Sequence, residues 1–324
     1  MYRGMPRYLI FLTGCIVLSG FPHGQTPEAQ SLSNRFAEEH HYTLTARIRP
    51  LLFWISRAGV GGGKIAWEEE AGVAKQIQLL IGSDPERAPR RINRWGYIRE
   101  SISGSSLELL GVMTESEEES IAEAQMRIEE TGARHAFKAI RGKVGDGRAE
   151  ATVVHLLTAE NYTYRDLDRF LPKIPVSGSV TPAVTLNEGV EPGFLVAVRN
   201  LIHDNVERFR SSGKAGGSKE KRLFVYNGAL YELTERSRKL QESVVVNGRP
   251  YRSVIESRFQ TRKMVDGGTS NFTIVYGTAD PIREVPIRIV YRPRWWFEAE
   301  LQLTDDPAVA LALQERPLWN PGHK

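Results

Sequence analysis

Cysteine is nearly absent from this chain of 324 residues, which carries only Cys15. One cysteine cannot form a disulfide within the chain, and beyond Cys15 no thiol is available for catalysis or for metal binding. The chain is 41% hydrophobic and 25% charged, a composition typical of soluble folded proteins. We therefore expect a fold that its hydrophobic core holds together without crosslinks.

The short motifs of common enzyme classes are also missing. The sequence has no G-x-S-x-G nucleophile motif and no H-E-x-x-H zinc motif. Gly59–Lys64 is glycine-rich and ends in lysine, but Ile65 replaces the serine or threonine with which a phosphate-binding loop holds magnesium. His135, His155 and His203 stand singly. These absences predict no metal and no cofactor, they leave no residue to name as catalytic, and they favour a non-catalytic protein.

Carboxylate catalysis leaves no short motif, because a glycoside hydrolase needs only two acidic side chains about 5–10 Å apart. The acidic runs at 68–70 and 117–119 are more typical of solvated surfaces, since like charges packed together repel one another. A carboxylate-dependent hydrolase acting on cell-wall glycans therefore stays open as an alternative.

Long apolar runs are absent after the first twenty residues. Residues 1–24 join two arginines to the apolar run Tyr8–Leu18, which is too short to span a bilayer and is typical of a secretory signal peptide. The mature chain is thus expected to be periplasmic or secreted, with no transmembrane span. Leu12-Thr13-Gly14-Cys15 resembles a lipobox, so a lipid anchor on Cys15 is the alternative to cleavage near residues 20–25.

The charge balance is mildly basic, with a formal net charge of +4. This is too little for a typical nucleic-acid-binding protein, and we expect no nucleic-acid partner. Basic residues cluster at 87–99 and 214–222. In an exported protein, such clusters favour a lipid-like or anionic ligand of the cell envelope. The sequence indicates no oligomeric state.

Most of the chain has the pattern of antiparallel hairpins. Residues 42–48 alternate between apolar and polar side chains, which indicates a strand with one wet face. Asn227-Gly228 and Asn247-Gly248 are typical of two-residue hairpin turns, because both central positions need a positive φ. Gly59–Gly63 and Asp266–Gly268 are expected to be turns as well.

Helices are predicted at 114–132, 163–171, 192–210 and 306–317. The third carries an apolar stripe, which is formed by Leu195, Val198, Ile202, Val206 and Phe209. We predict an α+β fold, mainly antiparallel β, as a curved sheet or half-barrel with helices packed on its concave face.

The predicted domain organisation is a signal peptide at 1–24, a flexible N-terminus at 25–39 and a single β-rich domain at 40–324. Residues 172–193 are rich in proline, glycine, serine and threonine and are the best linker candidate. A subdomain break would fall there.

Two segments join arginine to aromatic side chains, a pattern that can hold anionic or amphipathic ligands through hydrogen bonds and cation–π contacts. The candidate ligand-binding residues are Arg91, Arg94, Trp95 and Tyr97 in the first segment and Arg292, Arg294 and Trp296 in the second. The alternative for both segments is packing, because either face of a curved sheet can be covered.

Several of these segments together resemble an uncharacterised family of exported, β-rich bacterial proteins, known as a domain of unknown function. The likeness lies in the Val60-Gly61 hairpin, the helix 200–210 that leads into Arg222–Gly228, the Asn247-Gly248 hairpin and the run Glu284–Val290. It extends over most of residues 40–304, and the insert from Thr114 to Pro192 departs from it. The resemblance implies a half-barrel like that of periplasmic lipoprotein carriers, and it supplies no catalytic residues.

Three functions are compatible with this sequence. The favoured one is an exported envelope protein that binds a hydrophobic or amphipathic, lipid-like ligand in the hollow between the sheet and the helices. The alternatives are an envelope scaffold or interaction protein and the glycan hydrolase named above. A cavity beneath the stripe from Leu195 to Phe209 would favour the first.

Overall fold

The computed structural model describes residues 38–49, 54–70, 73–114, 135–215, 220–294 and 297–304. The predicted signal peptide with Cys15, and the predicted helices at 114–132 and 306–317 apart from Thr114, lie outside these residues. The predicted flexible N-terminus is described only from Glu38 onward, where it is already strand. These predictions stay predictions.

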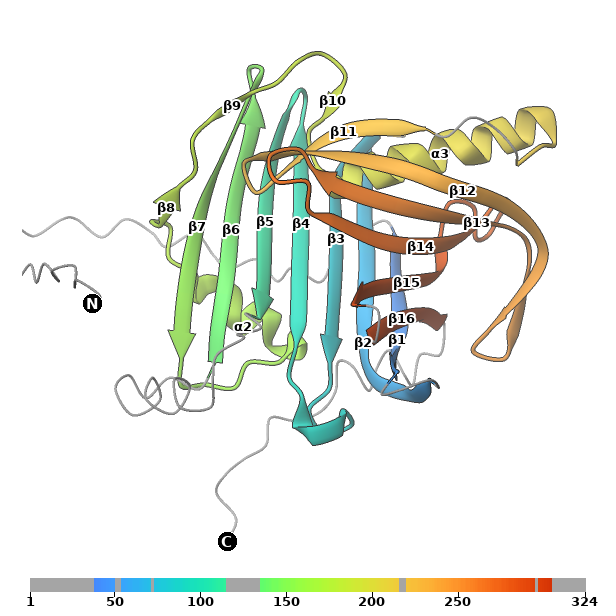
Figure 1. Cartoon of the computed structure of the whole chain (residues 1–324), viewed down its shortest axis with the longest axis horizontal. Helices are drawn as coiled ribbons and strands as arrows, with labels where there is room; N and C mark the ends of the chain where they lie inside the picture. Colours follow the sequence, from blue (N-terminus) through green and yellow to red (C-terminus); the bar gives the residue numbers. More distant parts are fainter. Residues whose placement is uncertain are drawn as a thin grey trace, which may run out of the picture. The chain divides into compact units, whose positions relative to one another are not determined.

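The described residues form one sheet of sixteen strands that is antiparallel apart from the pair β10–β11, together with a few helical segments (Figure 1). The first eight strands are β1 (Glu38–Ile48), β2 (Ile55–Glu70), β3 (Val73–Ser83), β4 (Trp95–Ser103), β5 (Ser106–Thr114), β6 (His135–Gly145), β7 (Arg148–Thr158) and β8 (Ser179–Val180). The others are β9 (Val184–Thr185), β10 (Val190–Glu191), β11 (Lys221–Tyr226), β12 (Ala229–Val246), β13 (Arg249–Lys263), β14 (Thr269–Gly277), β15 (Pro286–Arg294) and β16 (Phe297–Thr304).

Neighbouring strands of the sheet mostly follow one another in the chain. The exception is β16, which pairs with β1, so the first and last strands of the described residues are neighbours. Starting from β10, the order runs through β11 to β16, then to β1, and on to β8. The pairing of β1 with β16 in the middle of the sheet sets Leu44 opposite Leu301 and Tyr42 opposite Leu303. In Figure 1, β3 to β7 stand side by side and β11 to β14 run across them. The predicted α+β, mainly antiparallel fold is confirmed.

Among the described residues, two α-helices accompany the sheet. The short α2 (Leu167–Phe170) is flanked by 3₁₀ turns and buries Phe170 against Trp95 and Phe137. The long α3 (Phe194–Ser212) ends at Gly213, whose φ of 66° is the left-handed conformation that favours glycine as a cap. Within the described residues, no helix is long and apolar enough to cross a bilayer.

The Asn-Gly turns form as predicted. Asn227 and Gly228 have φ values of 50° and 63°, and Asn247 and Gly248 have 49° and 77°. These are the paired positive angles of tight hairpin turns. The side chain of Asn247 also donates to the backbone oxygen of Leu303, so the tip of the β12–β13 hairpin is tied to β16.

The prediction of a turn at Gly59–Gly63 is wrong. These residues lie within β2, and Gly61 to Gly63 pair with β1 on one side and β3 on the other. A Cβ atom on Gly61 would lie 2.0 Å from the carbonyl oxygen of Gly82. Gly61 and Gly63 are therefore explained by the close approach of β2 and β3, which leaves no room for a side chain, whereas Gly59 has a positive φ of 64°.

The predicted linker at 172–193 carries three two-residue strands. Of these, β8 and β9 pair with β7, and β10 pairs in parallel with β11. The chain thus passes from one end of the strand order to the other within this segment. The prediction of a subdomain break here stays a prediction.

Candidate functional site

The first turn of α3 is held by a carboxylate from a distant strand. The helix starts after Gly193, which has no side chain to cap it. Instead, the backbone N–H groups of Leu195 and Val196 donate to Oε1 and Oε2 of Glu100 on β4, at 3.0 and 2.9 Å. A Cβ atom on Gly193 would lie 2.4 Å from this carboxylate, so only glycine leaves space for it. Glu100 thus takes the place of the missing cap.

Burial governs the charge of Glu100. Its side chain is inaccessible to solvent, and loss of hydration raises its pKa to about 7 against the lowering effect of the backbone hydrogen bonds. The sequence offered no signal for this role, because nothing local marks a glutamate on a strand as the partner of a helix 95 residues away.

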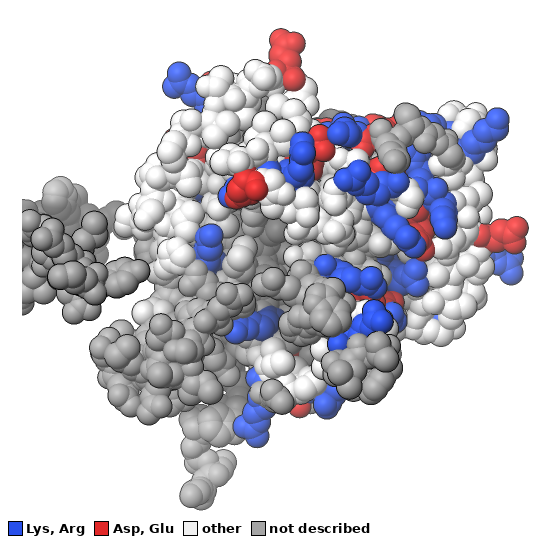
Figure 2. Space-filling model, viewed as in Figure 1, with Lys and Arg blue, Asp and Glu red and all other residues white. Residues whose placement is uncertain are grey.

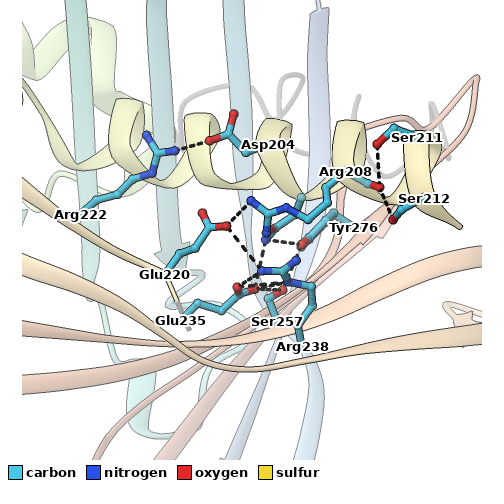
Figure 3. A network of polar contacts seen from close by, with 11 residues as sticks. Asp204, Arg208, Ser211, Ser212, Glu220, Arg222, Glu235, Arg238, Ser257 and Tyr276 are labelled. Carbon is cyan, nitrogen blue, oxygen red and sulfur yellow. Dashed lines mark hydrogen bonds and ion pairs between the residues drawn. The ribbon is translucent and has the colours of Figure 1, made fainter. Parts of the chain in front are cut away.

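The middle of α3 is joined to β12, β13 and β14 by a buried polar network (Figure 3). Oε1 of Glu235 accepts from Asn205 on the helix at 3.0 Å and from Ser257 at 2.6 Å. Arg238 donates to Oε2 of Glu235 at 2.6 Å, and Asn205 also donates to the hydroxyl of Tyr276 at 3.1 Å. The ion pair is matched and hydrogen-bonded, which such burial requires.

A β-bulge brings Glu235 and Arg238 together. In a regular strand, residues three apart face opposite sides of the sheet. The register of β12 against β13 shifts between Glu235 and Ser237, and this extra residue lets both charged side chains reach the same side. The bulge is not visible in the sequence, so neither residue could be predicted as buried.

Another side of α3 faces a cavity of about 970 Å³ between the helix and the sheet. Its walls come from β2, β3 and β4 and from β14 and β15, and most of the lining residues are apolar. Val198 and Ile202 of the predicted stripe line it, whereas Val206 is packed against β11–β14. The volume is at the upper end of the range for ligand pockets, and about six times that of a ~150 Å³ cavity able to bind benzene.

In the described part of the chain, six acidic, basic or histidine side chains line the cavity, and all but Arg283 interact with another of the six through ion pairs or Coulombic attraction. They are Glu38, Glu69, Arg199, His203, Arg283 and Glu284. Arg199 of α3 forms an ion pair with Glu69 at the end of β2, and Nδ1 of His203 lies 2.9 Å from Oε1 of Glu284. We call this group the charged end of the cavity. Its members are separated by up to 246 positions in the sequence, so no local pattern could predict it.

The first aromatic-basic segment is divided between core and surface. Trp95 and Tyr97 are 4% and 2% exposed, and the indole Nε1 of Trp95 donates to the backbone oxygen of Tyr162 at 2.9 Å. Arg91 and Arg94 are exposed near the loop between β3 and β4. None of the four is among the residues that line the cavity. Their role in ligand binding stays a prediction.

The second segment lies near the end of β15. Arg292 donates to Glu298 and lies 5.5 Å from the ring of Trp54. Arg294 is part of β15 and pairs in register with Phe297, and Trp296 lies outside the described residues. Tyr291 of the same strand does line the cavity, although it was not predicted as a ligand contact.

A further group of exposed basic side chains lies outside the two clusters predicted at 87–99 and 214–222. Figure 2 shows lysine and arginine side chains over the region of β12–β14. The exposed basic residues of β12 and β13 are Arg236, Lys239, Arg249, Arg252, Arg258 and Arg262. They are spread through the sequence and meet only because the two strands pair. We call this region the basic face.

Metal binding has no candidate in the part of the chain that the structure describes. There, no group of three or more histidine, aspartate, glutamate or cysteine side chains could hold an ion. The site that the geometry does offer is the cavity, with apolar walls and one charged end.

Comparison with known proteins adds a distant structural likeness. The sequence matches no protein-family model and no curated protein. Among solved structures, the chain is similar to a β-barrel-like protein of a domain of unknown function, DUF1849, from Brucella abortus, with a TM-score of 0.33 and 9% sequence identity. The alignment covers 82% of this chain and 94% of that one.

Proposed function

We propose that this chain is an exported protein of the cell envelope that binds a hydrophobic or amphipathic, lipid-like ligand in the cavity beneath α3. The observation that carries the proposal is the cavity itself, with about 970 Å³ of space, mostly apolar walls and a charged end. Apolar walls favour a ligand that loses hydration on entry, and each buried methylene contributes about 0.8 kcal/mol. The signal-like N-terminus supports the place of action.

Binding is tested by filling the cavity. Val198 lies on α3 and lines the cavity without being fully buried, so Val198→Trp places an indole in the ligand's space. The same substitution at Val176, which is 82% exposed, is the matched control. The probe is N-phenylnaphthylamine, whose fluorescence rises in apolar surroundings, titrated into full-length protein stripped of lipid.

We expect saturable binding by the wild type and by Val176→Trp, and an affinity at least tenfold lower for Val198→Trp. Thermal unfolding shows whether the variant is folded. If Val198→Trp unfolds, Val198→Phe provides a smaller filling group. Absence of binding by the wild type, or equal affinity in folded filled and control variants, would refute the proposal.

A further inference from the structure

The charged end of the cavity has a composition that selects among headgroups. Three carboxylates line it, those of Glu38, Glu69 and Glu284, against the two guanidinium groups of Arg199 and Arg283. Arg199 pairs with Glu69 and also feels the charges of Glu284 and Glu38. Arg283 instead forms an ion pair with Asp280, which does not line the cavity. The guanidinium of Arg199 is therefore the one that interacts with all three carboxylates.

Solvent reaches the charged end of the cavity at Glu38 and His203. The side chains of Glu38 and His203 are 52% and 51% exposed, while those of Arg199 and Glu284 are 23% and 18% exposed. Because the guanidinium of Arg199 is mostly buried, it has lost part of its hydration, and this lowers its pKa. A partly dehydrated cation gains most from an anionic oxygen of a ligand.

Each kind of headgroup fares differently here. A purely anionic headgroup is attracted by the guanidinium of Arg199, but the more numerous carboxylates repel it. A headgroup with both an ammonium and a phosphate can pair its positive charge with the carboxylates and its negative charge with the guanidinium of Arg199. The ammonium supplies N–H donors to carboxylates such as those of Glu38 and Glu284, and the phosphate accepts from Arg199.

We propose that the charged end holds the zwitterionic, ammonium-bearing headgroup of an aminophospholipid-like amphipath, with its apolar part along the walls toward Phe272 and Tyr291. This inference rests on the proposed function, because it names the class of ligand for the same cavity. Glu38 and Glu284 confer the specificity, and Arg199 orients the phosphate.

The test is competition between two lipids with identical acyl chains, phosphatidylethanolamine and phosphatidylglycerol. Both are presented in neutral detergent micelles, because the basic face would attract anionic vesicles whatever the cavity binds. Native mass spectrometry of the full-length protein then reports the ratio of the two bound lipids. We expect phosphatidylethanolamine to be preferred at least tenfold.

The double variant Glu38→Gln/Glu284→Gln removes two charges while keeping side-chain size. It should reduce or reverse the preference for phosphatidylethanolamine. Glu108→Gln/Glu242→Gln, at two exposed positions that do not line the cavity, is the matched control and should keep the wild-type ratio.

The outcomes separate the two proposals. Equal binding of both lipids, preference for phosphatidylglycerol, or an unchanged ratio in the double variant would overturn the headgroup assignment and leave the cavity a lipid-binding site. Binding of neither lipid, with no binding of N-phenylnaphthylamine, would overturn the proposed function as well.

Discussion

Replacing Glu100 by glutamine should flatten the pH dependence of stability. The native carboxyl group has a pKa raised to about 7, compared with an ordinary value of 4.5, because it is buried at the start of α3. The native state therefore takes up a proton at a higher pH than the unfolded state. The contribution of Glu100 to the unfolding free energy is therefore most favourable below pH 4.5, falls as the pH rises toward about 7, and is constant above that.

The magnitude follows from the two pKa values. Each pKa unit corresponds to about 1.4 kcal/mol, so the difference between 4.5 and about 7 corresponds to about 3 kcal/mol of unfolding free energy. The helix N-terminus acts in the opposite direction, since its N–H groups favour the anion. That effect is worth only about 0.3–2 kcal/mol, which is less than the desolvation of a fully buried carboxylate.

The assay is urea unfolding of full-length wild type and Glu100→Gln at several values between about pH 5 and about pH 8. Glutamine cannot ionise, and the hydrogen bond it fails to accept adds an offset that does not depend on pH. The advantage of wild type over variant should therefore shrink by about 2–3 kcal/mol across this range. Glu108→Gln, an exposed position on the neighbouring strand, controls for the loss of one carboxylate.

An advantage that stays constant with pH would contradict the assignment of a raised pKa to Glu100. An advantage that grows with pH would show that the helix N-terminus outweighs burial and that the native carboxylate is ionised. Either result would refute the reasoning, because burial would then not be the larger of the two effects.

Three further predictions concern packing and export. Val206→Asp should lower the unfolding free energy by about 3 kcal/mol or more, since Val206 is fully buried, and a midpoint in urea equal to the wild type's would contradict this. Gly61→Ala should cost about 1–3 kcal/mol because its Cβ would meet the carbonyl of Gly82, and a stable variant would show that β2 and β3 can separate there. Mass analysis of the mature protein should find a start near Gln25 or an acylated Cys15; an intact Met1 in the cytosol would count against export.

Local sequence patterns predicted the strands and turns well. Period-two alternation and Asn-Gly pairs are properties of short segments, and they act before distant parts of the chain meet. The helix that begins at Phe194 was also found from its apolar stripe. The prediction of a turn at Gly59–Gly63 was wrong because glycine occurs in two kinds of environment. It permits turns, and it permits close approach of a neighbouring strand, and only the identity of the neighbour separates the two.

The candidate site was much harder to predict. Glu38, Glu69, Arg199 and Glu284 come from β1, β2, α3 and the segment before β15. They meet because β1 pairs with both β2 and β16, a contact between the two ends of the described chain. The arginine-aromatic segments were conspicuous because their residues are adjacent in sequence. Adjacent residues of a strand point to opposite faces, so such a run seldom gathers in one site.

The polar contacts of α3 explain how a helix can border a cavity and still hold its place. Its N-terminus is anchored by Glu100, and its middle is anchored by Asn205 to Glu235 and Tyr276. The apolar side chains Leu201 and Val206 are packed against β11–β14. Ile202 is shared between the two, because it is packed in the same cluster and also lines the cavity. Val198 lines the cavity and is only partly buried, so a change of shape there should alter the cavity while the polar anchors stay in place.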